Sequence, residues 1–336
     1  MKQQCTWFAY LTEALNWSTM SKLPPGTVEA GRLNEYQPVL QNHDSYFPSL
    51  FHACSWFAAL SFFTTPAGIW SVCFGLQVSL GFANPEGVKT HPWTTLLRST
   101  AILSILSIST FFPFARCFDF LYLHNASLRC QPKKAHDVSG YNRSEVKLAA
   151  LNLVIAAFLT AVVGVSSQVA PELFPIYLTV EGSFGYAYML LSTILYFLWI
   201  DAWAYLSHRL LHFPKLYKAF HKWHHAYRQP TAFTALALHP FDFVLFQGGV
   251  YMGMLIIPMS MACIIVNLFY IHYYNVIHHS GVYLESFLPW ESSSLFHDDH
   301  HRFFHVNYGQ TLTFWDKMGG TLYTPKKKYS ESTFSY

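Results

Sequence analysis

Long runs of apolar residues divide this chain into blocks separated by polar segments. The runs occupy residues 49–83, 99–115, 148–170 and 183–206. A helix that crosses a lipid bilayer needs about 20 predominantly apolar residues. The pattern therefore predicts four membrane-spanning helices.

A further apolar stretch covers residues 241–278. Gly248, Gly249 and Pro258 interrupt this stretch, and histidines flank it at both ends. Because glycine and proline weaken or end helices, we expect a hairpin that enters the membrane and returns to the same side. The predicted fold class is all-α, a multi-span helical membrane protein.

The composition supports a membrane protein and excludes some other classes. Hydrophobic residues make up 52% of the 336-residue chain and charged residues only 12%, against roughly 25% charged residues in soluble domains. The formal charge of +3 is too small to indicate a nucleic-acid partner. The six cysteines form no CxxC pair, so neither a disulfide framework nor a thiolate metal site is indicated.

The distribution of charge predicts the orientation of the chain. Acidic residues, Glu172 and Glu181, mark the loop 171–182. By the positive-inside rule, the loop that is rich in lysine and arginine faces the cytosol. The basic loop lies between the second and third runs and contains Arg116, Arg129, Lys133, Lys134, Arg143 and Lys147.

This orientation predicts the domain organisation. The fourth run returns to the cytosol where another set of basic residues begins. Residues 1–48 then form an N-terminal cytosolic segment, residues 49–189 hold membrane spans, and residues 326–336 form a cytosolic tail. The basic residues that follow the fourth run are Lys215, Lys218, Lys222 and Arg228.

Histidines are concentrated in the C-terminal half of the chain. Of the 18 histidines, five lie before residue 140 and the other 13 lie between residues 208 and 305. Most of these recur at separations of three and four, which a helix converts into one shared face. Three groups result: His208-x3-His212, His221-x2-His224-His225 and His297-x2-His300-His301.

Another histidine pair, His278–His279, lies where the apolar hairpin ends. Adjacent helical residues point about 100° apart, so only one of the two is expected to face a shared site. With that residue the groups supply nine imidazoles, whereas a structural zinc site is closed by four ligands. Two metals, each held by four or five imidazoles, are therefore predicted.

The motifs that are absent help to identify the metal. Carboxylate-type di-iron bundles use Glu-x-x-His pairs and zinc peptidases use His-Glu-x-x-His, and the sequence contains neither. An all-histidine pair of redox-capable ions remains, for which iron is the best candidate. Neutral ligands leave the charge of the ions uncompensated, which favours a strongly oxidising site able to attack an unactivated C–H bond.

Several polar residues are candidates for the shell around the metal ligands. Asp201 and Tyr205 share a helical stripe with His208 and His212, although an interfacial carboxylate would look the same. Asp299 lies between ligand positions, where the alternative is a solvated turn.

For other residues near the motifs a structural role is at least as plausible. Asp298 could simply form a turn. His239 precedes Pro240 and could be an outer hydrogen-bond donor or a structural residue. His272 and His305 are interpreted as structural, and the role of His278 stays open.

The three histidine groups and the sequence around them resemble the sterol desaturase and fatty acid hydroxylase superfamily. The resemblance covers roughly residues 190–325. Besides the histidines it includes Asp201 with Tyr205, His239-Pro240 and HHSG. The longer matching stretches are HRLLH, LYKAFHKWHH and FHDDHHRFFHVNYGQTLTFWDKMGGTL.

This resemblance implies a catalytic region at residues 190–325, whose histidine-rich site for two metals lies in a cytosolic helical cap. It also implies an endoplasmic-reticulum enzyme that acts on a sterol or other lipid with two iron ions and O2. Its two electrons come from NAD(P)H through cytochrome b5 or its reductase. The implied ligands are His208, His212, His221, His224, His225, His279, His297, His300 and His301.

Within the superfamily, NYGQTLTFWDKMGG and PTAF look most like sterol C-5 desaturases. One motif differs, because these enzymes usually have HDG where this chain has His279-Ser280-Gly281. HSG is more like 4-methylsterol oxidases and sterol 25-hydroxylases, so desaturation and hydroxylation of a sterol, sphingoid or fatty acid chain both stay open. Outside enzymes, a metal transporter is the alternative, which would hold its ligands near the bilayer midplane.

Overall fold

The computed structural model describes residues 75, 78–125, 128–131, 143–177, 185–286 and 291–324. The expected segments 1–48 and 326–336 lie outside the described residues, as does most of the expected span at 49–83. The described part is mainly helical, and its sheet has only two strands of two residues each, so the predicted all-α fold is confirmed.

Long apolar helices form the body of the protein. They are α6 (Pro92–His124), α7 (Arg143–Val169), α8 (Gly185–Leu211) and α12 (Met261–His279). In the described residues these four helices are long and apolar enough to cross a membrane. The predicted spans at 99–115, 148–170 and 183–206 are therefore confirmed, and the chain is a multi-pass membrane protein.

The predicted hairpin consists of α11 (Pro240–Ile256) and α12. Its turn falls at residues 257–260, which include Pro258, whereas Gly248 and Gly249 lie inside α11 rather than interrupting it. The turn contains β2 (Met259–Ser260), which pairs in parallel with β1 (Ile176–Tyr177). This small sheet ties the hairpin to the connection between α7 and α8.

The glycines of α11 allow that helix to pack closely on α8. A Cβ atom at Gly249 would collide with the ring of Trp203, and one at Gly253 would lie 2.7 Å from Tyr196. The Trp203 indole also donates a hydrogen bond to the Leu245 carbonyl at 2.9 Å. The glycines therefore have a packing role, which explains why the helix continues through them.

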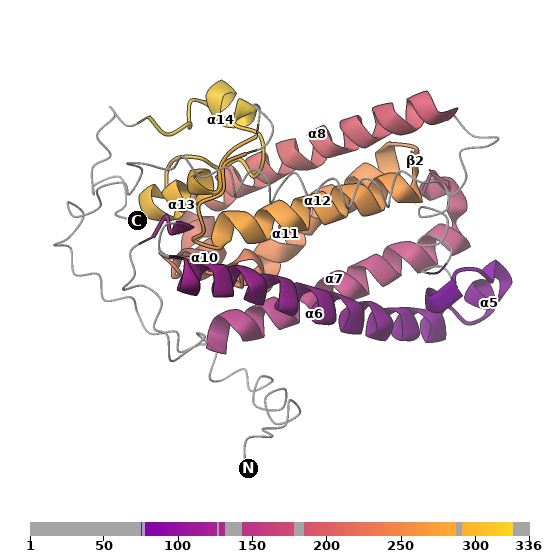
Figure 1. Cartoon of the computed structure of the whole chain (residues 1–336). Helices are drawn as coiled ribbons and strands as arrows, with labels where there is room; N and C mark the ends of the chain where they lie inside the picture. The colour runs from indigo at the N-terminus through magenta and orange to yellow at the C-terminus, as the bar shows by residue number, and fades with distance from the viewer. Residues whose placement is uncertain are drawn as a thin grey trace, which may run out of the picture.

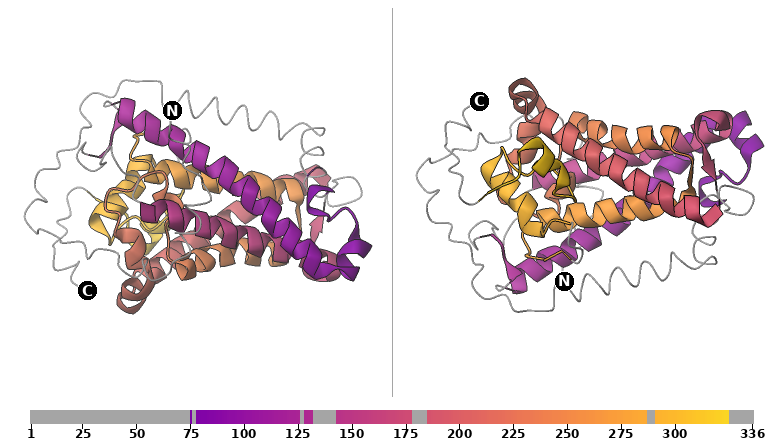
Figure 2. Two further views of the ribbon diagram at one scale, coloured as in Figure 1. Left: turned by 90° about the horizontal axis from the view of Figure 1, so that it is seen from below. Right: turned by 90° about the horizontal axis from the view of Figure 1, so that it is seen from above.

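Short helices gather at one end of the bundle. This group comprises α9 (Pro214–Leu216), the π-helix η5 (Tyr217–His221), α10 (Lys222–His225), the 3-10 helix η6 (Thr234–Leu236), α13 (Ser294–Phe303) and α14 (Phe314–Gly319). Figure 1 shows α10, α13 and α14 at the end of the bundle opposite α5 (Pro85–Thr90) and β2. In Figure 2 the yellow α13 and α14 again cover one end, while the indigo α5 lies at the other. A second 3-10 helix, η4 (Pro171–Leu173), follows α7.

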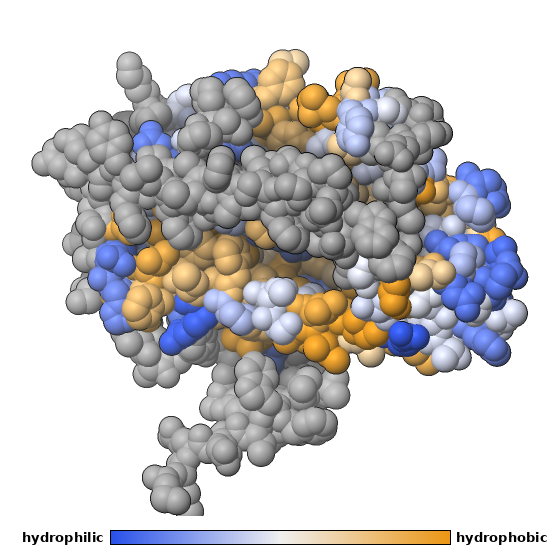
Figure 3. Space-filling model, turned by 45° about the vertical axis from the view of Figure 1, so that its right-hand side comes forward, coloured by the Kyte–Doolittle hydropathy of each residue, from blue (hydrophilic) through white to orange (hydrophobic). Residues whose placement is uncertain are grey.

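The surface of the long helices is apolar where lipid would contact it. Leu97 on α6, Phe158 on α7 and Leu190 on α8 are exposed. Figure 3 shows such apolar residues along the helices, with polar residues concentrated toward the end that carries α5. Because lipid is an apolar solvent, exposed leucine and phenylalanine are ordinary on this surface.

Candidate metal centre

The predicted ligand histidines come from four parts of the chain. These parts meet among the short helices at the end of the bundle that carries α10, α13 and α14, which form the cap. His208 lies in the last turn of α8 and His279 ends α12. All nine predicted ligands are buried. The remaining members are His212 directly after α8, His221 at the end of η5, His224 and His225 on α10, and His297, His300 and His301 on α13.

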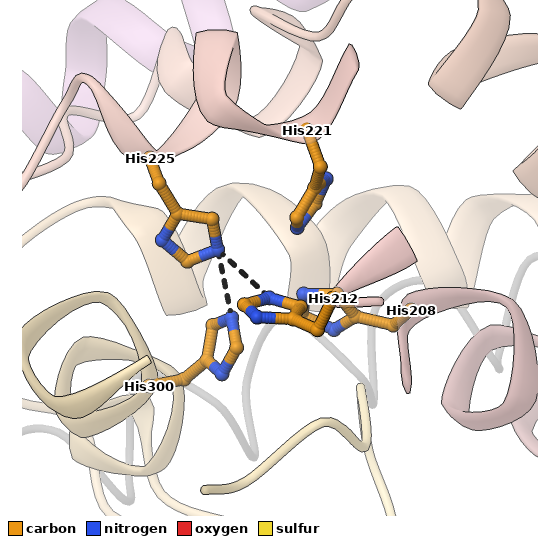
Figure 4. A group of neighbouring side chains, drawn as sticks. All are labelled: His208, His212, His221, His225 and His300. Carbon is orange, nitrogen blue, oxygen red and sulfur yellow. Dashed lines mark hydrogen bonds between the residues drawn. The ribbon is translucent and has the colours of Figure 1, made fainter. Parts of the chain in front are cut away.

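The nine histidines form two separate groups. Within each group, one ring nitrogen per residue lies within 4.8 Å of the others. Neighbouring residues of a pair are divided between the groups, because successive helical side chains point about 100° apart. The first group is His208, His212, His221, His225 and His300, drawn in Figure 4; the second is His224, His279, His297 and His301.

Distances inside each group fit coordination of a metal ion. His225 Nε2 lies 3.1 Å from both His212 Nε2 and His300 Nε2. His279 Nε2 lies 3.0 Å from His297 Nε2. A metal–imidazole bond is about 2.0–2.1 Å long, so two nitrogens on one ion at 90–110° lie roughly 2.8–3.4 Å apart.

Hydrogen bonds at the outer nitrogens fix how several rings face inward. His208 Nδ1 pairs with the Tyr308 carbonyl at 2.9 Å, and His300 Nδ1 with the Val306 carbonyl at 2.7 Å. His279 Nδ1 pairs with the Asn275 carbonyl at 2.7 Å. A carbonyl only accepts, so Nδ1 carries the hydrogen and Nε2 presents a lone pair.

Several of the buried nitrogens are left without hydrogen-bond partners. In the described part of the chain these include Nε2 of His208, Nε2 of His221 and both ring nitrogens of His301. Unpaired polar atoms in such a site are costly, and converging lone pairs repel one another. A cation within each group would remove both penalties, so the donor set fits metal ions.

Burial also keeps the imidazoles of the cap in the state that binds metal. It holds the pKa values of His212, His225 and His300 well below the ordinary 6.5, and neighbouring histidines lower them further. Metal ions compete with protons for the same lone pairs. These side chains are therefore neutral and ready to coordinate at neutral pH.

A carboxyl group that the sequence reasoning missed contacts one of the predicted ligands. His221 Nδ1 lies 3.1 Å from Asp242 Oδ2, and the Asp242 side chain is completely buried in the first turn of α11. Such a partner orients a ligating imidazole and raises its basicity. The available signal was a lone acidic residue at the start of an apolar helix, directly after His239-Pro240 and Phe241.

The structure places Asp201 and Tyr205 beside the site without hydrogen bonds to its histidines. Asp201 accepts hydrogen bonds from the backbone N–H of Thr311 at 3.0 Å and from the Trp315 indole at 2.9 Å. Tyr205 lies 3.3 Å from the Thr321 hydroxyl. Both residues therefore fasten the segment after α13 onto α8, including Tyr308, whose carbonyl holds His208.

The other candidates lie around the cap. Asp298 accepts a hydrogen bond from Gln131 at 2.5 Å, whereas none is found for the Asp299 carboxylate within the described residues. Burial raises the pKa of Asp299 to about 6, and Arg302 opposes that shift. His239 caps α11 by accepting from the Phe241 N–H, and its ring packs against Trp223. His272, His278 and His305 belong to neither metal group.

A cavity extends from the metal groups into the body of the bundle. His208, His224 and His279 line one end of it. Apolar side chains of α8, α11 and α12 form much of the remaining wall: Ile200, Ala204, Phe243, Phe246, Val250 and Ile271. An apolar ligand in this cavity would lie directly beside the metal groups.

Comparison with known proteins identifies the region that carries this centre. Residues 193–321 match the fatty acid hydroxylase family. This segment contains all nine predicted ligand histidines and the hairpin. The superfamily resemblance predicted from the motifs is therefore confirmed.

Relatives with assigned activities are similar over somewhat less than half of the chain. The Delta(7)-sterol 5(6)-desaturase of Eremothecium gossypii is 32% identical over 148 residues, covering 44% of this chain and 42% of the relative. The corresponding enzyme of Saccharomyces cerevisiae is 30% identical over 157 residues, covering 45% and 43%. Human lathosterol oxidase is 30% identical over 158 residues, covering 46% and 53%. The match thus spans about half the length of these relatives, and no solved structure matches the chain.

Proposed function

We propose that this chain is a membrane-bound oxidase that uses two iron ions and O2 to introduce the 5(6) double bond into a Δ7-sterol. The observation that carries the proposal is the pair of buried all-histidine groups at the end of an apolar cavity. The similarity to Delta(7)-sterol desaturases supports the substrate class.

The reaction sets requirements that this site meets. Removing two hydrogens from adjacent carbons with O2 gives one double bond and two waters, and consumes two electrons and two protons. An iron pair, when bound, supplies the redox chemistry that reduces O2 and oxidises an unactivated C–H bond. The electrons would come from NAD(P)H through cytochrome b5 or its reductase.

The residues of the chain would orient the metal ligands and keep water away from the reacting groups. The outer hydrogen bonds of His208, His279 and His300 keep Nε2 aimed inward, which limits reorganisation when a metal binds. Asp242 does the same for His221. Apolar walls keep water from the cavity and align the lipid beside the metals.

Hydroxylation is the second candidate reaction, and the match to the fatty acid hydroxylase family favours it. A sterol, a sphingoid chain, a fatty acid or a 4-methylsterol would be its substrate. The HSG motif does not separate the two reactions. Ser280 Oγ donates to the Ile277 carbonyl and accepts from the Val282 N–H, so it shapes a buried turn outside the cavity lining.

Metal transport is a poorer fit to the placement of the ligands. His208 and His279 lie at the ends of α8 and α12, whereas transporter sites lie near the middle of the membrane between broken helices. The exposed Lys218, Lys222 and Arg228 at the same end support a cytosolic orientation. We infer an endoplasmic-reticulum membrane location from this orientation and the sterol chemistry.

Sterol analysis in a yeast strain that lacks its own C-5 desaturase tests the proposal. Expression of the chain should produce Δ5,7-sterols detectable by mass spectrometry, and His224→Ala should abolish them while the protein still inserts into the membrane. A hydroxylated sterol would select the second candidate. Purified protein should hold about two irons per chain, and stoichiometric zinc without iron-dependent turnover would contradict the iron assignment.

A further inference from the structure

The wall of the cavity includes polar side chains that the metal groups do not use. Gln247 on α11, His272 on α12 and Gln310 after α13 all line it. Gln247 and His272 belong to apolar helices of the bundle, and Gln310 contacts one of these helices through the Ile271 carbonyl. Polar groups there are expensive unless they are paired or functional.

Gln247 has an amide with both donors and acceptor available. Within the described residues its side chain makes no hydrogen bond, and it is half-buried where it faces the cavity. It follows Asp242 by five residues, which corresponds to about 7.5 Å along α11. The amide therefore lies on the membrane side of the first metal group.

His272 offers a hydrogen-bond acceptor to the same cavity. Its Nδ1 pairs with the Leu268 carbonyl at 2.7 Å, so Nδ1 carries the hydrogen and Nε2 has a lone pair that no described residue shares. Gln310 is its neighbour, since Gln310 Nε2 donates to the Ile271 carbonyl at 3.4 Å. The side-chain oxygen of Gln310 makes no hydrogen bond to the described residues and is a second acceptor.

We propose that Gln247, His272 and Gln310 form a subsite that binds the hydroxyl group of the lipid substrate. A hydroxyl donates its single proton to His272 or Gln310 and accepts from the Gln247 amide, which satisfies Gln247 and one of the two acceptors. A carboxylate has no proton to donate and would meet the lone pair of His272. The subsite therefore selects an alcohol, such as a sterol, over a free fatty acid.

The depth of this subsite also limits which carbon is oxidised. His272 precedes His279 by seven residues, or about 10 Å along α12. Part of this distance is taken by a hydrogen bond of about 2.8 Å to the hydroxyl and by an approach of about 3–3.5 Å to the reacting carbon. Roughly 4 Å then remains between the hydroxyl oxygen and the carbon that is oxidised. The hydroxyl oxygen and the oxidised carbon must then lie within a few bonds of each other, on the same or adjacent rings rather than at opposite ends of the lipid.

This inference deepens the proposed function and rests on its lipid substrate, so its test measures binding as well as turnover. Binding of tritiated lathosterol and of its 3-deoxy analogue to the full-length protein in detergent is compared. The wild-type protein should bind lathosterol about tenfold more tightly, the effect of one to two buried hydrogen bonds. His272→Leu and Gln247→Leu should reduce this ratio toward one, and His272→Gln should restore part of it.

Matched controls carry the same changes away from the cavity. Gln168→Leu at the end of α7 and His124→Leu at the end of α6 should leave the ratio unchanged. Equal binding of the two sterols by the wild-type protein would overturn the subsite without using any variant. Hydroxyl-dependent binding without Δ5,7 product would support the subsite and contradict the proposed reaction. Formation of the Δ5,7 product together with equal binding of the two sterols would support the proposed reaction and contradict the subsite.

Discussion

At the scale of single residues, the hydrogen bond from His221 to Asp242 makes a specific prediction. Asp242→Asn keeps the shape of the side chain but replaces the carboxyl group that contacts His221 Nδ1 with an amide, which cannot ionise when a metal binds the ring. Loss of such a partner typically costs roughly 10–100-fold in metal affinity. We expect a corresponding drop in iron retained after dialysis against a chelator, measured by elemental analysis.

Asp299→Asn is the matched control, because Asp299 makes no hydrogen bond to any histidine of the described chain. It should retain iron nearly as well as the wild-type protein. If the two variants lose iron equally, Asp242 has no special role in holding His221. Circular dichroism verifies that both variants remain folded.

The sequence predicts the histidines of the site but not the carboxyl group that contacts one of them. Helical spacing places His221, His224 and His225 close together, and the structure gathers all three with the other groups. Spacing alone does not divide them, because the division depends on how α10 faces α8 and α13. Asp242 is separated from His221 by 21 positions and shares no periodic pattern with it, so only the fold reveals their contact.

At the scale of helices, the contact between α8 and α11 predicts a large difference between two neighbouring glycines. A Cβ at Gly249 would overlap the Trp203 ring, whereas one at Gly248 would lie 3.9 Å from the nearest atom. Overpacking typically costs about 1–3 kcal/mol. Gly249→Ala should therefore lower the thermal unfolding midpoint in detergent.

Gly248→Ala should keep or raise that midpoint, because alanine favours a helix by up to about 1 kcal/mol over glycine. Equal midpoints for the two variants would contradict the close approach of α11 to Trp203. The pair also explains a limit of sequence reasoning. The apolar pattern predicts that these glycines interrupt the hairpin, but a glycine that permits close packing looks the same in a sequence as one that ends a helix.

At the scale of the whole molecule, the histidine cap predicts how stability depends on pH. Burial lowers the pKa values of histidines such as His300 and His301 below the ordinary 6.5. Below pH 6.5 these histidines take up protons in the unfolded chain but stay neutral in the folded chain. Their contribution to the free energy of unfolding is therefore fully present above pH 6.5 and is lost as pH falls. The thermal unfolding midpoint of the metal-free protein should therefore be lower at pH 5.5 than at pH 7.5.

Buried carboxyls oppose this trend, and two of them on α13, Asp298 and Asp299, provide the control. Burial raises the pKa of Asp298 to about 7 and that of Asp299 to about 6. The folded chain therefore binds more protons there than the unfolded chain, which stabilises it as pH falls toward 4. Replacing both with asparagine should steepen the acid-induced drop. A midpoint that does not change with pH in either protein would contradict the neutral, buried state of the histidines.

The arrangement of the helices predicts which ends face the same side of the membrane. Arg228 is exposed just after α10 at the histidine end, and Glu172 is exposed in η4, which follows the far end of α7. In a cysteine-free background, Arg228→Cys on sealed microsomes should react with a membrane-impermeant maleimide. Glu172→Cys should react only after detergent opens the vesicles. The reverse pattern would place the metal groups in the lumen, where cytosolic electron donors could not reach them, so this measurement constrains both the orientation and the electron supply of the proposed oxidase.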